Sequence, residues 1–207
     1  MKKVHVLNIG YPKCGTTWLW DTLVKNNSIS DFWTKENNCL ISGTPVDAYC
    51  QQYIKDVSAN FSVTNLVLDR YVIQQLSDRP QMVVSIIIRE PVELLWSLYN
   101  YTKVPDIDFS GFCYRMYDSK WWTRPSLIIE RWKKSFGDRF NVFWYDDLKS
   151  NNLQFYKNYC RLMGLQANNA EMLKKINITD YKNPMPPIDQ DIEDLLKIES
   201  QKVLAYR

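Results

Sequence analysis

Histidine is nearly absent from this chain of 207 residues, which contains a single one, at position 5. His5 lies within the first apolar run, so we interpret it as a packed strand residue and not as a catalytic base. The five cysteines are scattered and include no Cys-x-x-Cys pair, which indicates neither a zinc site nor a disulfide framework. We therefore expect no metal site and reduced thiols.

Long apolar runs and a strong charge of one sign are also missing. No run approaches the length of a membrane-spanning helix, and the first one begins almost at Met1, which leaves no room for a signal peptide. We therefore expect a cytoplasmic protein. The net charge of +3 is small and dispersed, which argues against a nucleic-acid partner and favours a local positive pocket for a small polyanion. The sequence does not indicate an oligomeric state.

The apolar runs and the helical patterns between them predict one α/β domain over residues 1–207. With 45% apolar and 24% charged residues, the composition is that of an ordinary globular domain. Strands are predicted at 4–9, 66–68, 82–88 and 140–144. Helices are predicted at 16–25, 127–136 and 153–163, and others begin near 44, 91 and 189. The expected fold class is a three-layer, P-loop-like α/β fold with a central parallel β-sheet flanked by helices.

Two stretches, 31–43 and 104–125, are predicted to be irregular. The second is long and rich in aromatic residues, which favours either a lid or wall over a site or a local packed cluster. Ligands of such folds bind at the carboxyl ends of the strands, so we expect both stretches near the site.

A glycine-containing loop follows the first predicted strand. Its sequence continues into a helix as Gly10-Tyr11-Pro12-Lys13-Cys14-Gly15-Thr16-Thr17-Trp18. The backbone N–H groups, the helix start and the lysine ammonium together make a cradle for an anion. The two glycines match the frame of the ATP-type phosphate loop, but Lys13 lies inside the loop and Thr16 occupies the position of that motif's lysine. The loop therefore predicts phosphate binding of another type.

A second anion anchor is predicted after the strand at 82–88. Arg89 follows this strand, Pro91 opens a helix, and Ser97 lies two turns further on. A guanidinium fork and a hydroxyl in these places could clamp one phosphate. The alternative is that Arg89 pairs with Glu90 or Glu93 and that Ser97 is a surface helix residue.

Both motifs resemble those of the sulfotransferases that use 3′-phosphoadenosine 5′-phosphosulfate (PAPS) and release 3′-phosphoadenosine 5′-phosphate (PAP). Residues 11–18 are similar to the 5′-phosphosulfate loop Tyr-Pro-Lys-Ser-Gly-Thr-Thr-Trp, with cysteine in place of serine. The step of eight residues from arginine to serine is similar to the 3′-phosphate motif. The resemblance implies in-line transfer of the sulfuryl group to an acceptor hydroxyl without a metal. It assigns PAPS binding to Lys13, Cys14, Gly15, Thr16, Thr17, Trp18, Arg89 and Ser97.

The resemblance also implies a glutamate base. The carbohydrate and tyrosyl-protein branches of the family place a glutamate about twenty residues beyond the loop glycine, often after a lysine. This chain has Lys35-Glu36, and Glu36 is 21 residues past Gly15. The chain is thus most similar to the carbohydrate and bacterial-type branch, which implies catalytic roles for Lys13, Glu36 and Ser97.

Aromatic residues just before Glu36 in the sequence are expected to form the walls around its side chain. Walls formed by Phe32 or Trp33 would raise the pKa of Glu36 toward its working range. Asp69 is the reserve candidate for the base, and Arg70 could reach the sulfate or an acidic acceptor.

The expected acceptor is a carbohydrate, because the glutamate base favours one and Trp33, Trp121 and Trp122 could stack on sugar faces, although the same aromatic residues could equally bind an apolar alcohol. A tyrosyl hydroxyl or a small alcohol would suit the same chemistry. Two other functions stay open. One is a nucleotide or small-molecule kinase that binds Mg²⁺ through Asp69 at the end of the predicted strand 66–68. The other is a non-catalytic module that binds PAP or PAPS.

Overall fold

The computed structural model describes residues 4–26, 29, 35–53, 57–119, 122–167 and 184–207. In these residues, four parallel strands form one sheet in the order β2-β1-β3-β4. The strands are β1 (His5–Asn8), β2 (Ser58–Asn60), β3 (Met82–Ile88) and β4 (Phe140–Trp144). The predicted α/β fold with a central parallel sheet is thus confirmed.

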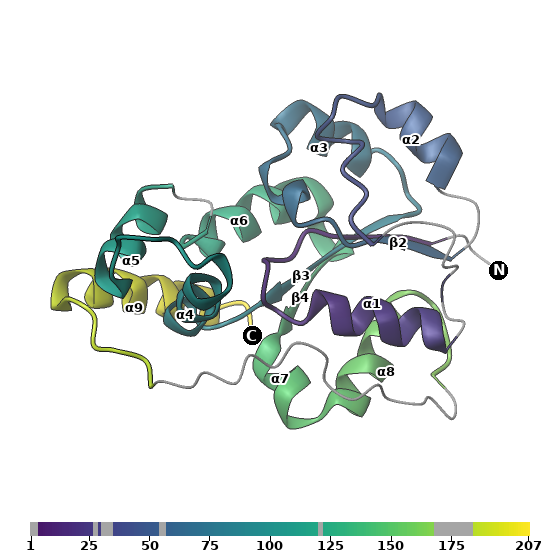
Figure 1. Ribbon diagram of the computed structural model, residues 1–207. Coiled ribbons are helices and arrows are strands. Elements are labelled where there is room, and N and C mark those ends of the chain that lie inside the picture. The colour runs from purple at the N-terminus through teal and green to yellow at the C-terminus, as the bar shows by residue number, and fades with distance from the viewer. Residues whose placement is uncertain (1–3, 27–28, 30–34, 54–56, 120–121, 168–183) are drawn as a thin grey trace.

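Helices surround this sheet (Figure 1). Helices α1 (Thr16–Lys25) and α8 (Asn152–Leu162) lie on one side. Helices α2 (Val46–Tyr53), α3 (Arg70–Ser77) and α6 (Pro125–Phe136) lie on the other. Three more gather beyond the carboxyl end of β3, namely α4 (Pro91–Thr102), α5 (Phe109–Asp118) and α9 (Gln190–Leu204). The short helix α7 (Tyr145–Ser150) follows β4, and two 3₁₀ helices are η1 (Val63–Val67) and η2 (Gly137–Arg139).

Strand β3 is apolar along nearly its whole length because it is an inner strand that is covered on both faces. Its sequence is Met-Val-Val-Ser-Ile-Ile-Ile, and it pairs with β1 on one side and β4 on the other. The residue after it is Arg89, and the residues after β1 are the glycine-containing loop. Both predicted anchors therefore start from the carboxyl edge of adjacent strands.

A second, smaller core joins the three helices beyond the sheet edge. It consists of the buried residues Leu95, Leu98, Phe109, Phe112, Cys113, Ile192 and Leu196. We call this group the three-helix cluster. It holds α5 and α9 against α4, which is the helix that follows Arg89.

The prediction of a strand at 66–68 was wrong. Leu66 and Leu68 are buried, but they enter the core at and just after the 3₁₀ helix η1. The edge strand is β2 instead, which is too short and polar to produce an apolar signal. Side-chain hydrogen bonds hold it: Ser58 Oγ lies 2.7 Å from His5 Nδ1, and Asn60 Nδ2 donates to the Tyr49 hydroxyl at 3.2 Å.

The prediction that 104–125 is irregular was also wrong in part, because α5 lies within this stretch. Asp108 caps the helix by accepting a hydrogen bond from the backbone N–H of Gly111 at 2.7 Å. Phe109, Phe112 and Cys113 lie on one face and are buried. Of the aromatic residues in this stretch, Phe109 and Phe112 thus pack in a buried cluster on one face of a helix.

His5 packs inside the fold, as expected. Its ring is buried, and Nε2 lies 2.7 Å from the Tyr49 hydroxyl. Burial lowers the pKa of His5 to about 3, so the ring is neutral at neutral pH.

Within the described ranges, no helix combines the length and the apolar character that a membrane crossing requires.

The packing of α6 can be tested with two substitutions. Trp132 is fully buried, whereas Leu127 of the same helix is 47% exposed. We expect Trp132→Ala to lower the free energy of unfolding by about 3–5 kcal/mol, because it leaves a large cavity. Leu127→Ala, the matched control, should change it by about 0.5 kcal/mol or less. Urea unfolding followed by circular dichroism measures both, and equal losses would contradict the described packing.

Candidate functional site

The backbone of the glycine-containing loop is held in a shape that few residues could adopt. The backbone N–H of Gly10 donates to Asn8 Oδ1 at 2.9 Å, which fixes the exit from β1. Lys13 and Gly15 have left-handed backbones, with φ of 61° and 80°. A Cβ on Gly15 would lie 2.4 Å from Leu148 Cδ2, so only glycine fits there. The loop is therefore shaped by close contact with α7.

The first turn of α1 offers donors rather than acceptors. Gly15 is its N-cap, no side chain of the described residues caps it, and its first turn contains no acidic residue. Its orphan N–H groups and the partial positive charge of the helix start are thus free of a protein carboxylate. This arrangement fits an anionic group.

The structure brings Lys13 and Arg89 together. Nη1 of Arg89 donates a hydrogen bond to the backbone oxygen of Lys13 at 3.2 Å. The Lys13 ammonium lies 4.2 Å from the centre of the Tyr101 ring, and no carboxylate in the described part of the chain pairs with it. Burial and the neighbouring Arg89 guanidinium both lower the pKa of Lys13. Two positive charges therefore meet at one place.

Arg89 also makes the ion pair that the sequence left open. Its Nη2 lies 3.3 Å from Glu93 Oε2, and its guanidinium stacks 4.6 Å from the centre of the Tyr145 ring. The Arg89 side chain is only 11% exposed, whereas that of Glu93 is 43% exposed. The carboxylate also pairs with Lys149 at 3.5 Å. Glu93 thus holds the guanidinium in position from the solvent side.

Ser97 lies on the face of α4 that is turned toward the loop. It is buried, one helical turn after Glu93 and one turn before Tyr101. Those two neighbours contact Arg89 and Lys13, respectively. Glu93, Ser97 and Tyr101 therefore share one face of α4, and two of the three contact the cations.

The side chains of the loop differ in what they offer to a ligand. Cys14, Thr16 and Trp18 are buried, and Thr17 is partly exposed. Burial raises the pKa of the Cys14 thiol to about 12, so the thiol is neutral and packs in the main core. Trp18 packs in the same core, as its helical spacing alone would suggest. Apart from Lys13 and the threonines, the loop presents its backbone.

Glu36 lies at the carboxyl edge of the sheet, beside β2. The backbone oxygen of Lys35 accepts a hydrogen bond from the N–H of Phe61, which follows β2. The Glu36 side chain is 46% exposed and pairs with Lys35 Nζ at 2.9 Å. Phe32 and Trp33, the walls expected around it, lie outside the described residues.

Asp69, the reserve candidate, has a structural partner. It is the N-cap of α3, and its side chain accepts a hydrogen bond from the backbone N–H of Val72 at 2.9 Å. No strand ends at this residue, so the Mg²⁺-binding strand end of the kinase alternative is missing here. Among the described residues, no group of three or more His, Cys, Asp or Glu side chains is arranged to hold a metal ion.

Residues of helix α9 form hydrogen bonds with the start of α4 and with the start of α6. Ser200 Oγ donates to Glu90 Oε1 at 3.2 Å, and Glu90 Oε2 caps α4 by accepting from the Glu93 N–H at 2.8 Å. At the start of α6, the Ser126 hydroxyl donates to the carboxylate of the buried Glu199, whose two oxygens lie 2.7 and 2.9 Å from Ser126 Oγ. The start of α4, and with it Arg89, is thus fixed by a helix about a hundred residues later in the chain.

The sequence did not point to Tyr101 or Tyr145 as partners of the two cations, whereas the pair of Arg89 with Glu93 was one of the alternatives that it left open. The helical spacing of Glu93, Ser97 and Tyr101 was a usable signal, because residues four apart share a helix face. Tyr145 gave no such signal. It follows β4, whereas Arg89 follows β3, and the two residues meet only because these strands are neighbours in the sheet.

The adjacency of the two cations predicts a pKa change. We expect Arg89→Met to raise the pKa of Lys13, because a neighbouring positive charge disfavours the ammonium and its removal relieves that effect. The measurement is an NMR titration of the lysine Cε resonances. Arg161→Met on α8 is the control and should leave this pKa unchanged. An unchanged or lower pKa in Arg89→Met would contradict the adjacency.

No protein-family model matches this sequence, and no curated protein matches it. Solved structures do match its fold. A sulfotransferase from Alicyclobacillus acidocaldarius is 16% identical, with 99% of this chain and 94% of that chain covered and a TM-score of 0.66. The sulfotransferase domain of the Synechococcus PCC 7002 olefin synthase is 14% identical, with coverages of 99% and 94% and a TM-score of 0.58.

A third similar structure is mouse sulfotransferase SULT7A1 complexed with PAP. It is 18% identical with a TM-score of 0.58, and the match covers 83% of this chain but only 62% of that one. At these identities the likeness concerns the fold. The chain has the fold of the sulfotransferases.

Proposed function

We propose that this chain is a PAPS-dependent sulfotransferase, which transfers a sulfuryl group to a hydroxyl of an acceptor molecule. One observation carries the proposal: the Arg89 guanidinium donates to the backbone of Lys13. The two motifs that resemble the 5′-phosphosulfate loop and the 3′-phosphate motif therefore adjoin each other, although 76 residues separate them. A ligand with phosphate groups at both ends of one nucleoside suits such a pair.

The residues at the loop fit PAPS. The left-handed Gly15 leaves room where a Cβ would meet Leu148, and the uncapped start of α1 presents N–H donors. In the proposal, this backbone, the threonine hydroxyls and the Lys13 ammonium hold the 5′-phosphosulfate. Arg89 and Ser97 hold the 3′-phosphate. The assignment of Trp18 to the adenine stays a prediction, since its side chain packs in the core.

PAPS, when bound, supplies an activated sulfuryl group. In the proposed reaction, Glu36 takes the proton of the acceptor hydroxyl as the acceptor oxygen bonds to sulfur. The bond from sulfur to the bridging oxygen breaks, and PAP carries that oxygen away. Lys13 stabilises the charge that develops on this oxygen. Its lowered pKa makes it a better hydrogen-bond donor than an ordinary lysine.

The acceptor expected from the sequence is a carbohydrate hydroxyl, with a tyrosyl hydroxyl or a small alcohol as other acceptors for the same chemistry. Lys13, Arg89 and the helix start supply the positive charge that Mg²⁺ supplies in kinases. The proposal therefore includes no metal.

The binding part of the proposal predicts that PAP binds without Mg²⁺ and more tightly than ATP. Lys13→Met and Arg89→Met should each weaken PAP binding by about tenfold to a hundredfold, because each removes a charged hydrogen-bond donor. Lys157→Met, on the exposed side of α8, is the matched control and should have no effect. Isothermal titration calorimetry measures these affinities. Absence of PAP binding, or tighter binding of ATP with Mg²⁺, would overturn the proposal.

The catalytic part predicts a loss of turnover without a loss of binding. Glu36→Gln should lower kcat by about 10²–10⁴-fold, because it removes the general base, while PAP affinity stays the same. Asp69→Asn is the control, since asparagine caps α3 as well as aspartate does. It should retain kcat within about twofold. Transfer of labelled sulfate from PAPS measures kcat. Unchanged turnover in Glu36→Gln would remove Glu36, and a loss in Asp69→Asn would make Asp69 the base.

A further inference from the structure

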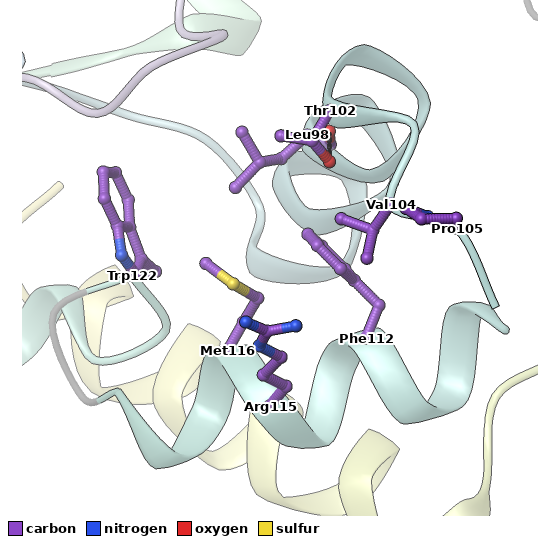
Figure 2. A pocket seen from close by; sticks show the side chains of 8 residues that line it. All are labelled: Leu98, Thr102, Val104, Pro105, Phe112, Arg115, Met116 and Trp122. Atoms are coloured by element: carbon purple, nitrogen blue, oxygen red, sulfur yellow. Dashed lines mark hydrogen bonds between the residues drawn. The ribbon is translucent and has the colours of Figure 1, made fainter. Parts of the chain in front are cut away.

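An apolar pocket of about 460 Å³ lies between α4 and α5 (Figure 2). Most of its lining is hydrocarbon or aromatic, contributed by Leu98, Val104, Phe112, Met116 and Trp122. Leu98 and Phe112 also belong to the three-helix cluster, so this wall of the pocket is part of a packed core. A wall of this kind suits an apolar ligand better than a sugar, whose hydroxyls need many hydrogen-bond partners.

Helix α4 contributes residues both to the pocket and to the surroundings of Lys13. Leu98 and Thr102 line the pocket, and Tyr101 lies between them in the same turn of α4. The Tyr101 ring is the one that the Lys13 ammonium contacts at 4.2 Å. Tyr101 itself is 68% exposed. A ligand in the pocket could thus extend past Thr102 and Tyr101 toward Lys13.

One charged side chain faces this apolar lining. Figure 2 shows the Arg115 guanidinium rising from α5 into the space beside Met116 and Phe112. No carboxylate of the described residues pairs with Arg115. In the described part of the chain, Asp118, three residues later on α5, makes no ion pair with Arg115, and Asp108 caps the start of this helix. An unpaired guanidinium beside an apolar wall is complementary to an anionic group on an apolar ligand.

We propose that the acceptor is an apolar hydroxy acid, a molecule with a hydrocarbon or aromatic body, a hydroxyl and a carboxylate. Its body lies on Leu98, Phe112 and Trp122, its carboxylate pairs with Arg115, and its hydroxyl reaches the Lys13 end. This inference rests on the proposed sulfotransferase function. It replaces the carbohydrate expected from the sequence by an acceptor class that the apolar lining and the Arg115 guanidinium both favour.

The test compares two ligands that differ only in the charged end, 10-hydroxydecanoate and 1,10-decanediol. Calorimetry on the protein saturated with PAP gives their affinities, and labelled PAPS gives their turnover. We expect the hydroxy acid to bind about tenfold more tightly than the diol, because a charged hydrogen bond is gained. Arg115→Gln should remove this preference while the diol and PAP bind as before.

Arg161→Gln is the matched control, because Arg161 is an exposed arginine on α8, away from the pocket. It should retain the preference for the hydroxy acid. Equal binding of the two ligands, failure of both to bind, or a preference that survives in Arg115→Gln would overturn the inference. If PAP binds in those cases, the proposed sulfotransferase function stands. If PAP does not bind, the proposed sulfotransferase function is wrong, whatever the two ligands do in the pocket.

Discussion

Two cations meet at the carboxyl edge of the sheet, and of the two only Arg89 pairs with a carboxylate of the described residues, that of Glu93. The candidate site depends on this contact. Arg89 donates to the backbone oxygen of Lys13, and the guanidinium lowers the pKa of the ammonium beside it. The repulsion costs free energy in the protein alone. A polyanion removes that cost when it binds, so the same contact that opposes the free state favours the bound one.

The fold makes this contact through strand pairing. β1 and β3 are neighbours in register, with Asn8 opposite Ser85. Lys13 lies five residues after the end of β1, and Arg89 directly follows β3. A shift of register by one residue would turn every side chain of the strand to the other face. The buried Asn8, which bonds both Ser85 Oγ at 3.0 Å and the N–H of Gly10 at 2.9 Å, ties the register to the loop.

Much of this arrangement could be predicted from the sequence, because it is encoded locally. Strands β3 and β4 are apolar runs, and α1 has apolar residues at helical spacing. The loop after β1 has an unusual composition of glycine, lysine and threonine. Strand β2 could not be found, since Ser58 and Asn60 are held by side chains from distant segments. The contacts of Tyr101 and Tyr145 with the cations also depend on which elements become neighbours in space. For Glu36, the position and the aromatic walls could be predicted from the sequence, but the ion pair with Lys35 could not.

The three-helix cluster has a role in both halves of the site. Its α9 member fixes Glu90 and hence the start of α4 beside Arg89, while Leu98 and Phe112 form a wall of the pocket. Under the proposed function, the sites for the two substrates are therefore coupled. A change that reshapes the pocket through α5 would be transmitted by the shared packing to the guanidinium, so selection for a new acceptor would also alter the affinity for PAPS.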